Sequence, residues 1–165
     1  SSNKNEKPNS SWTESQKLKE EVARYSDGVN TMVGRLQIGS LVNVRVIKAK
    51  ANHQWVTDQY DSAAWIENAT TYISDHVTQN PGFYKLNQVK VGTKAAIVDG
   101  TTTKRYTCVE TGIGKRDGIQ ILDKNGKSME ARGKNIAFCT YTCSKTEKGY
   151  IDQVNVFYAV WKQTS

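Results

Sequence analysis

The sequence contains no apolar run close to the ~18 residues that a membrane-spanning helix needs. Its three cysteines are too few for a disulfide scaffold, and their odd number leaves at least one thiol free unless two chains pair. No glycine-rich loop lies between a predicted strand and a predicted helix, so we predict no nucleotide or redox cofactor. These absences exclude a disulfide-rich miniprotein and a dinucleotide-dependent enzyme.

The spacing of cysteine and histidine also argues against two kinds of cross-link. On one predicted strand Cys139 and Cys143 would lie roughly 13 Å apart. That separation exceeds the ~7 Å limit between the Cα atoms of a disulfide, so we predict no bridge between them. The only two histidines, His53 and His76, lie far from this cysteine pair, whereas zinc sites use close ligand pairs. We therefore predict no metal site.

The length and charge of the chain narrow the choice of partner. A chain of 165 residues fits one domain. Lys and Arg outnumber Asp and Glu by 23 to 16, and the net charge of +7 favours approach to anionic surfaces. The charge alone would suit a module that binds cell-wall or nucleic-acid polyanions. Because the basic residues are scattered along the chain, we predict no nucleic-acid partner.

The chain begins with a polar segment and one helix. Residues 1–12 are low in complexity and have the composition of a flexible linker. Thr13 and Gln16 resemble a capping box, and apolar residues then recur at helical spacing. We predict an amphipathic helix at residues 14–25 that packs on the rest of a domain spanning residues 13–165.

Short strands dominate the remaining sequence. Runs rich in Val, Ile, Tyr and Thr predict strands at residues 41–47, 71–75, 94–98, 104–111, 118–122, 127–131, 136–143 and 153–161. Asn125-Gly126 is typical of a tight hairpin, and residues 61–68 are expected to form a helical turn or two. Many short strands with one helix indicate a mostly β fold, closed or nearly closed into a barrel.

A thiol and an imidazole stand at the ends of two predicted strands. Cys143 ends the run Thr140-Tyr141-Thr142-Cys143, and His76 follows the strand at 71–75. A thiolate is a strong nucleophile that a neighbouring histidine can activate, so the pair indicates acyl transfer if both strand ends share one rim. Cys108 and Cys139 lie inside predicted strands and are expected to be packing residues. His53 is the rival base.

Several segments together resemble a sortase domain. Residues 82–94, which contain Val89-Lys90-Val91-Gly92-Thr93-Lys94, resemble the middle of that domain, as do residues 95–100 and 105–109. The run that ends in Cys143 is similar to the sortase Thr-Leu-x-Thr-Cys motif, and residues 154–161 resemble the closing strand. The resemblance covers residues 36–162. It implies a closed sortase-type barrel of about eight strands, with His76 in the place of the family histidine.

The resemblance also implies an activity. Sortases are extracytoplasmic cysteine transpeptidases, mainly of Gram-positive bacteria, that cut a sorting signal and join it to an amine. By this resemblance Cys143 forms a thioester with the sorting signal of a surface protein, and His76 protonates the leaving amine. The acceptor amine would come from the cell wall or from pilin. We expect a monomer at the bacterial cell surface, held in the full-length protein by a membrane anchor.

One departure from the family pattern leaves the activity open. Sortases carry an arginine on the closing strand, but no arginine follows Arg132 in this sequence. Gln153 and Asn155 are the positional substitutes, since an amide can also donate a hydrogen bond. Arg105, Arg116 and Arg132 could compensate from a neighbouring strand or loop. The alternative is a sortase-fold protein with weak or no catalysis that binds a peptide or a surface-assembly partner.

Overall fold

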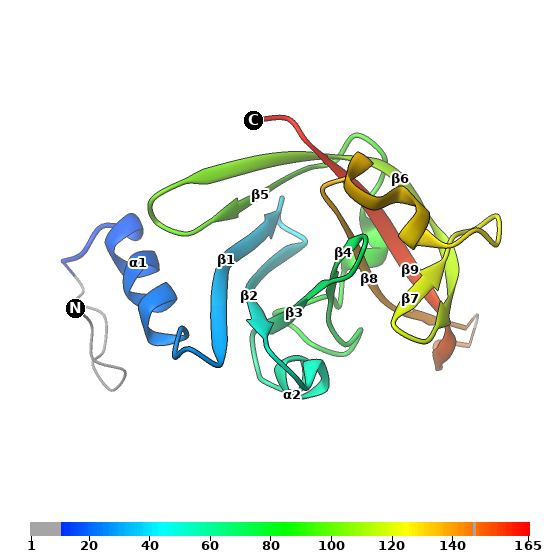
Figure 1. The fold of residues 1–165 in the computed structure, drawn as a ribbon, viewed down its shortest axis with the longest axis horizontal. Coiled ribbons are helices and arrows are strands. Elements are labelled where there is room, and N and C mark those ends of the chain that lie inside the picture. Colours follow the sequence, from blue (N-terminus) through cyan, green and yellow to red (C-terminus); the bar gives the residue numbers. More distant parts are fainter. Residues whose placement is uncertain (1–10, 147) are drawn as a thin grey trace.

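The computed structural model describes residues 11–146 and 148–165 (Figure 1). The first ten residues of the predicted linker 1–12 lie outside the described residues. Within the described part, nine strands accompany one helix of 11 residues and three shorter helical segments. No helix in this part is long and apolar enough to cross a bilayer.

The chain forms one large β-sheet that curls on itself. Its strands are β1 (Asn30–Ile38), β2 (Val42–Ala49), β3 (Ser62–Glu67), β4 (Thr71–Ser74), β5 (Lys94–Val98), β6 (Thr103–Asp117), β7 (Gln120–Leu122), β8 (Phe138–Lys145) and β9 (Ile151–Gln163). The helical segments are α1 (Glu14–Arg24), α2 (His53–Thr57), η1 (Leu86–Gln88) and η2 (Met129–Asn135).

The pairing of the strands closes a barrel. Their order is β5-β1-β2-β3-β4-β8-β9-β6-β7, and β5 also pairs with β6. Eight described strands thus form a ring, and β7 is attached to β6 outside it. The pairs β2–β3 and β4–β8 are parallel, whereas the other pairs are antiparallel. The prediction of a mostly β, closed barrel of about eight strands is confirmed.

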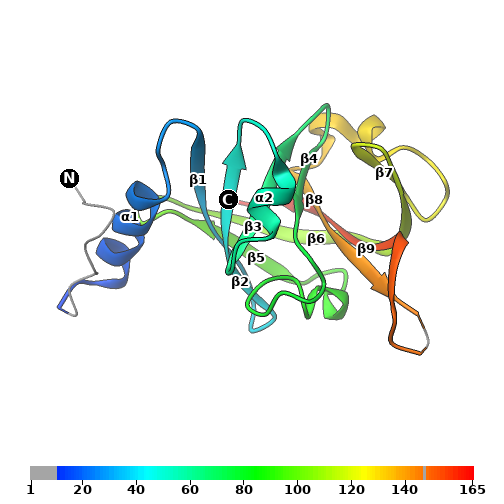
Figure 2. The ribbon, with the colours of Figure 1, turned by 90° about the horizontal axis from the view of Figure 1, so that it is seen from below.

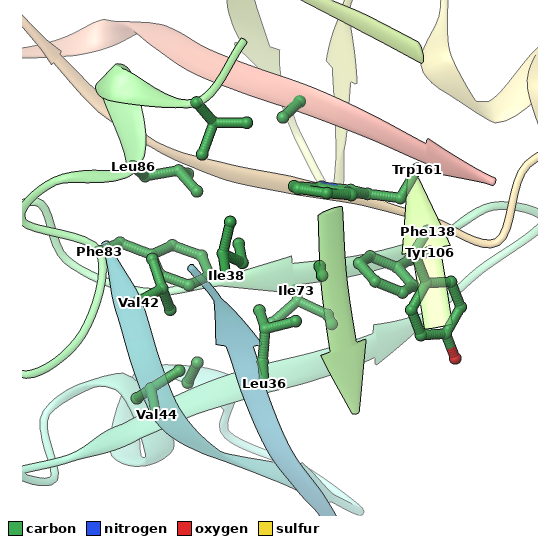
Figure 3. Close-up of a cluster of buried hydrophobic side chains, with 14 of the residues drawn as sticks. Leu36, Ile38, Val42, Val44, Ile73, Phe83, Leu86, Tyr106, Phe138 and Trp161 are labelled. Atoms are coloured by element: carbon green, nitrogen blue, oxygen red, sulfur yellow. The ribbon is translucent and has the colours of Figure 1, made fainter. Parts of the chain in front are cut away.

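Alternate residues of these strands fill the barrel with an apolar core (Figure 3). Ten of the core side chains are labelled there: Leu36, Ile38, Val42, Val44, Ile73, Phe83, Leu86, Tyr106, Phe138 and Trp161. Trp161 is fully buried, and its Nε1 donates a hydrogen bond to Thr140 Oγ1 at 3.0 Å. This bond satisfies the one polar atom that the indole brings into the core.

A second apolar cluster covers the outer side of β4, β8 and β9. Its residues on these strands are Tyr72, Cys139, Tyr141, Val156, Tyr158 and Val160. Three further residues from the β7 to β8 region pack over them: Ile121, Met129 and Ile136. Because side chains alternate along a strand, Cys143 lies on the same outer side as Tyr141, whereas Thr142 faces the interior.

The helix α1 attaches to the barrel through charge. Thr13 and Gln16 form the predicted capping box, each side chain accepting from the backbone N–H of the other. Glu21 accepts a hydrogen bond from Arg35 on β1 at 2.8 Å, and Arg35 also pairs with Asp61 at 2.9 Å. In both views α1 lies at the end of the molecule opposite β7 (Figures 1 and 2).

Two local predictions are wrong. Residues 127–131 form no strand, because Met129–Asn135 is a 3-10 segment whose start is capped by Ser128 accepting from the Glu130 N–H. The turn at Asn125-Gly126 does form, but it is followed by only an isolated bridge. Residues 61–68 contain β3 rather than a helical turn, since pairing with β2 and β4 buries this segment. Tertiary pairing overrides a weak local pattern here.

Candidate active site

The parallel pairing of β4 with β8 places two strand ends side by side. The register matches Ser74 with Tyr141, and beyond it Thr142 Oγ1 donates to the Asp75 carbonyl at 2.8 Å. His76 follows Asp75 at the end of β4, and Cys143 follows Thr142 at the corresponding position of β8. The fold therefore brings the imidazole-bearing and thiol-bearing ends to the same rim of the barrel.

The sulfur of Cys143 has a cationic partner. Arg116 Nη2 donates to Cys143 Sγ at 3.2 Å, and the guanidinium also lies 5.8 Å from the centre of the Tyr141 ring. Cys143 is 9% exposed. The guanidinium therefore stands directly beside the atom that would react as a nucleophile.

Arg116 contacts a strand that β6 does not pair with, and two glycines of β6 allow close packing next to it. β9 lies between β6 and β8, so the guanidinium must pass over it. A Cβ at Gly112 would stand 2.9 Å from the Tyr158 hydroxyl, and one at Gly114 would collide with the Leu122 carbonyl. Glycine at both positions therefore allows β6 and β7 to fold closely over the outer side of β9.

The other two arginines considered from the sequence lie elsewhere. Arg132 is held between Glu110 at 3.1 Å and Asp123 at 2.9 Å. Arg105 lies at the other end of β6, opposite Ala96 of β5. Of the three, Arg116 is the one that contacts the sulfur.

The amides predicted as substitutes are placed less directly. Asn155 Nδ2 donates to Asp152 Oδ2 at 2.7 Å, so this donor already has a partner. The side chain of Gln153 lies outside the described part of the structure. A role for Gln153 or Asn155 stays a prediction. The sequence did not single out Arg116 from the other two arginines. Arg116 lies 27 residues from Cys143, on a strand two places across the sheet, and no spacing rule connects residues placed in this way.

The ring of His76 is held by α2 and the residue after it. Its Nε2 lies 2.9 Å from Asp58 Oδ1, 3.2 Å from Gln54 Nε2 and 3.3 Å from Thr57 Oγ1. The side chain of His76 is 36% exposed. Hydrogen bonds from His76 and Gln54 hold the pKa of the Asp58 carboxyl below its usual value. The imidazole therefore sits beside an ionised carboxylate at neutral pH.

A small polar cavity lies between His76 and Arg116. It encloses about 130 Å³, and both histidines line it together with Ser74, Arg116 and Tyr141. Binding pockets for whole drug-sized ligands measure about 300–1,000 Å³, so this cavity suits a small group or one side chain. His53, the rival base, thus lies at the same cavity as His76.

Asp75 brings a buried carboxyl next to the site. It is 3% exposed, its Oδ1 accepts from the His76 N–H at 2.8 Å, and its Oδ2 has no partner among the described residues. Burial raises the pKa of this carboxyl to about 8, against the opposing effect of the His76 N–H. Gly82 packs against Oδ2 so closely that a Cβ there would lie 2.5 Å from it.

The other cysteines have a different environment from Cys143. All three cysteines are free. Cys108 and Cys139 are 1% and 0% exposed, and burial raises the pKa of both thiols. Both are therefore packing residues, as the sequence predicted. Among the described residues, no group of three or more His, Cys, Asp or Glu side chains is arranged to hold a metal ion.

Comparison with known proteins finds likeness in structure rather than in sequence. No protein-family model and no curated protein matches the sequence. Among solved structures, sortase A of Listeria monocytogenes matches with a TM-score of 0.55 and 20% identity, over 81% of this chain and 88% of that chain. Sortase C of Streptococcus pneumoniae matches with a TM-score of 0.58 and 12% identity, over 87% and 73%.

A third structure covers more of both chains. The sortase D5 transpeptidase of Clostridium perfringens matches with a TM-score of 0.52 and 13% identity, over 94% of this chain and 91% of that chain. At such identities the likeness concerns the backbone arrangement. It agrees with the resemblance that the sequence motifs indicate over residues 36–162. The chain has the closed β-barrel fold of the sortases.

Proposed function

We propose that the protein is a cysteine transpeptidase of the sortase type. Cys143 is the nucleophile, His76 the acid and base, and Arg116 the group that stabilises negative charge on the reacting carbonyl oxygen. The observation that carries the proposal is the 3.2 Å contact between Arg116 and the sulfur at the strand end beside His76. A guanidinium on β6 thereby takes the place of the arginine that the closing strand lacks.

The reaction would run in two halves. The Cys143 thiolate attacks the carbonyl carbon of the scissile peptide bond, and the resulting oxyanion accepts an N–H from Arg116. As the C–N bond breaks, the His76 imidazolium gives its proton to the leaving amine, so a thioester and a neutral imidazole remain. An acceptor amine then attacks the thioester, His76 takes the proton of that amine, and the thiolate leaves.

The substrate side of the proposal follows the family resemblance. The donor would be an extended sorting signal of a surface protein, and the acceptor an amine of the cell wall or of pilin. The pneumococcal sortase C among the structural neighbours has pilin substrates. The protein would act outside the cytoplasmic membrane, anchored to it in the full-length chain. Gln153 and Asn155 would orient the acyl group beside Arg116.

Mass spectrometry of intact protein tests the enzyme claim. We expect incubation with a panel of sorting peptides to add an acyl group to Cys143. Hydroxylamine, an amine that cleaves thioesters, should then remove this acyl group. Cys143→Ala should form no adduct. If the unaltered chain forms none either, and Cys143 reacts with thiol reagents no faster than Cys108 and Cys139, the transpeptidase proposal fails.

A second candidate function rests on how confined the site is. Cys143 is only 9% exposed and the adjoining cavity holds about 130 Å³, which favours a protein that binds a peptide without cleaving it. In that case peptide binding, measured by calorimetry, survives Cys143→Ala, and the unaltered chain yields no product. A measurable product would remove this alternative.

A further inference from the structure

The groups around His76 Nε2 decide which of its ring nitrogens carries a hydrogen. The Asp58 carboxylate, 2.9 Å away, can only accept. The Thr57 hydroxyl, 3.3 Å away, gives its own hydrogen to the Gln54 carbonyl at 3.1 Å, so its oxygen also faces Nε2 as an acceptor. The Gln54 amide, whose nitrogen lies 3.2 Å from Nε2, donates one of its two hydrogens to Asp58 Oδ1 at 2.9 Å. The nearest of the three groups is thus the Asp58 carboxylate, and its contact with the ring requires an Nε2–H.

Asp58 is fixed in place although its side chain is exposed. Its backbone N–H donates to the Gln54 carbonyl at 3.0 Å and so ends α2. Val56, fully buried, packs α2 against β3 in a cluster that includes Ala64. At the start of α2 the Asn52 side chain accepts from the Trp55 N–H at 3.1 Å. The carboxylate thus stands on a short element held at both ends and in the middle.

We propose that Asp58 is the positioning residue for His76, accepting its Nε2–H and so leaving Nδ1 as the nitrogen that exchanges a proton with the substrate. This inference rests on the proposed transpeptidase function. It assigns to α2 the task that a third group performs behind a catalytic histidine, which is to fix the tautomer and the orientation of the ring. Asp58 does not touch the reacting atoms.

The arrangement distinguishes His76 from the second histidine at the cavity. His53 lines the same cavity, but within the described residues no carboxylate contacts its ring. The side chain of Asp58 is 55% exposed, so in its absence water can accept part of the hydrogen bonding of the His76 ring. We therefore expect its loss to cost about tenfold in kcat, below the ~10⁴-fold loss that a buried aspartate in this role can cause.

Nuclear magnetic resonance of ¹⁵N-labelled histidine tests the positioning without any need for turnover. The chain has only two histidines, and His53→Gln assigns the remaining signals to His76. At a pH where the imidazole is neutral, we expect nitrogen shifts of a pure Nε2–H tautomer. Asp58→Ala should give shifts averaged over both tautomers. A hydrogen on Nδ1 in the unaltered chain, or identical shifts in the two proteins, would overturn the proposal.

Kinetics with a matched control completes the test. Asp58→Asn, which removes only the charge, should lower kcat about tenfold with KM unchanged, and Asp58→Glu should recover part of it. Glu67→Gln removes another exposed carboxylate with a partner, the ion pair to Lys48 at 3.0 Å, and should change neither constant. Equal effects of Asp58→Asn and Glu67→Gln would overturn the positioning role. If the tautomer is as expected but no acyl adduct forms, the proposed function fails while the positioning by Asp58 stands.

Discussion

The interior and outer faces of β8 and β9 carry different kinds of contact. On the interior face, Phe138 and Trp161 stack in a closed apolar core, with ring centres 6.2 Å apart. On the outer face, Tyr141 and Cys143 lie beside the guanidinium of Arg116, and a polar cavity is lined by Tyr141 and Arg116. Consecutive residues of a strand thus alternate between the apolar core and the candidate site. The interior face fixes the backbone, and the outer face carries the proposed nucleophile and its cationic neighbour.

Thiol labelling should give the largest contrast between the environments of the cysteines. We expect iodoacetamide to modify Cys143 first in the native protein. Cys108 and Cys139 should react at least about 10³-fold more slowly, because a buried thiol meets the reagent only when the structure opens. Peptide mapping by mass spectrometry measures the three rates. Comparable rates for all three would mean that the outer face does not set Cys143 apart.

Removal of an interior aromatic side chain should have the largest effect on stability. Trp161→Ala leaves a cavity in the barrel core and should lower the free energy of unfolding by about 3–5 kcal/mol. Tyr150→Ala, at a position that is 71% exposed, should change it by less than about 0.5 kcal/mol. Urea unfolding followed by tryptophan fluorescence of the remaining tryptophans or by circular dichroism measures both. Similar midpoints would contradict the assignment of Trp161 to the core.

The sequence allowed the interior face to be predicted better than the outer one. The strand predicted at residues 94–98 matches β5 residue for residue, and the closed barrel that surrounds the core was expected. Periodicity reports burial, which is a local property of each strand. The contact of Arg116 with Cys143 depends instead on the order of strands in the sheet, which brings β6 within two places of β8. No local pattern encodes such a contact, and for the same reason the partner of His76, Asp58, was not foreseen.

Loss of the guanidinium should produce the next largest effect, now on catalysis. Arg116→Ala should lower kcat by about 10²- to 10³-fold, the range for removal of one donor to a developing oxyanion. Arg116→Lys keeps the charge but loses the planar fork of donors, so its kcat should lie between that of the unaltered chain and that of Arg116→Ala.

A matched arginine on the same strand is the control for this prediction. Arg105→Ala removes the same charge from the other end of β6, far along the strand from the sulfur, and should leave kcat within about twofold. Rates of thioester formation, measured in single turnovers, compare the variants at equal folded concentration. If Arg105→Ala and Arg116→Ala lose activity equally, net charge rather than the contact with Cys143 explains the effect.

Asp75 is the buried residue that precedes His76, and its replacement should have the smallest effect. Its pKa of about 8 in the folded chain stands above the ~3.9 of an unfolded aspartate, so the folded state holds this proton more tightly. Stability is therefore highest below about pH 4 for this group, and it falls as the pH rises toward 8. Asp75→Asn keeps the shape of the protonated form but cannot ionise.

The comparison of the two proteins across pH isolates this carboxyl. We expect Asp75→Asn to exceed the unaltered chain in unfolding free energy by a margin that grows between pH 4 and pH 8, reaching about 1–3 kcal/mol. Asp99 gives a control of opposite sign, because backbone N–H groups of Thr102 and Thr101 lower its pKa. Asp99→Asn should therefore destabilise the protein above pH 4. If the difference in unfolding free energy between Asp75→Asn and the unaltered chain did not change with pH, the buried carboxyl would be ionised in the folded chain. The buried position beside His76 would then tolerate a charge.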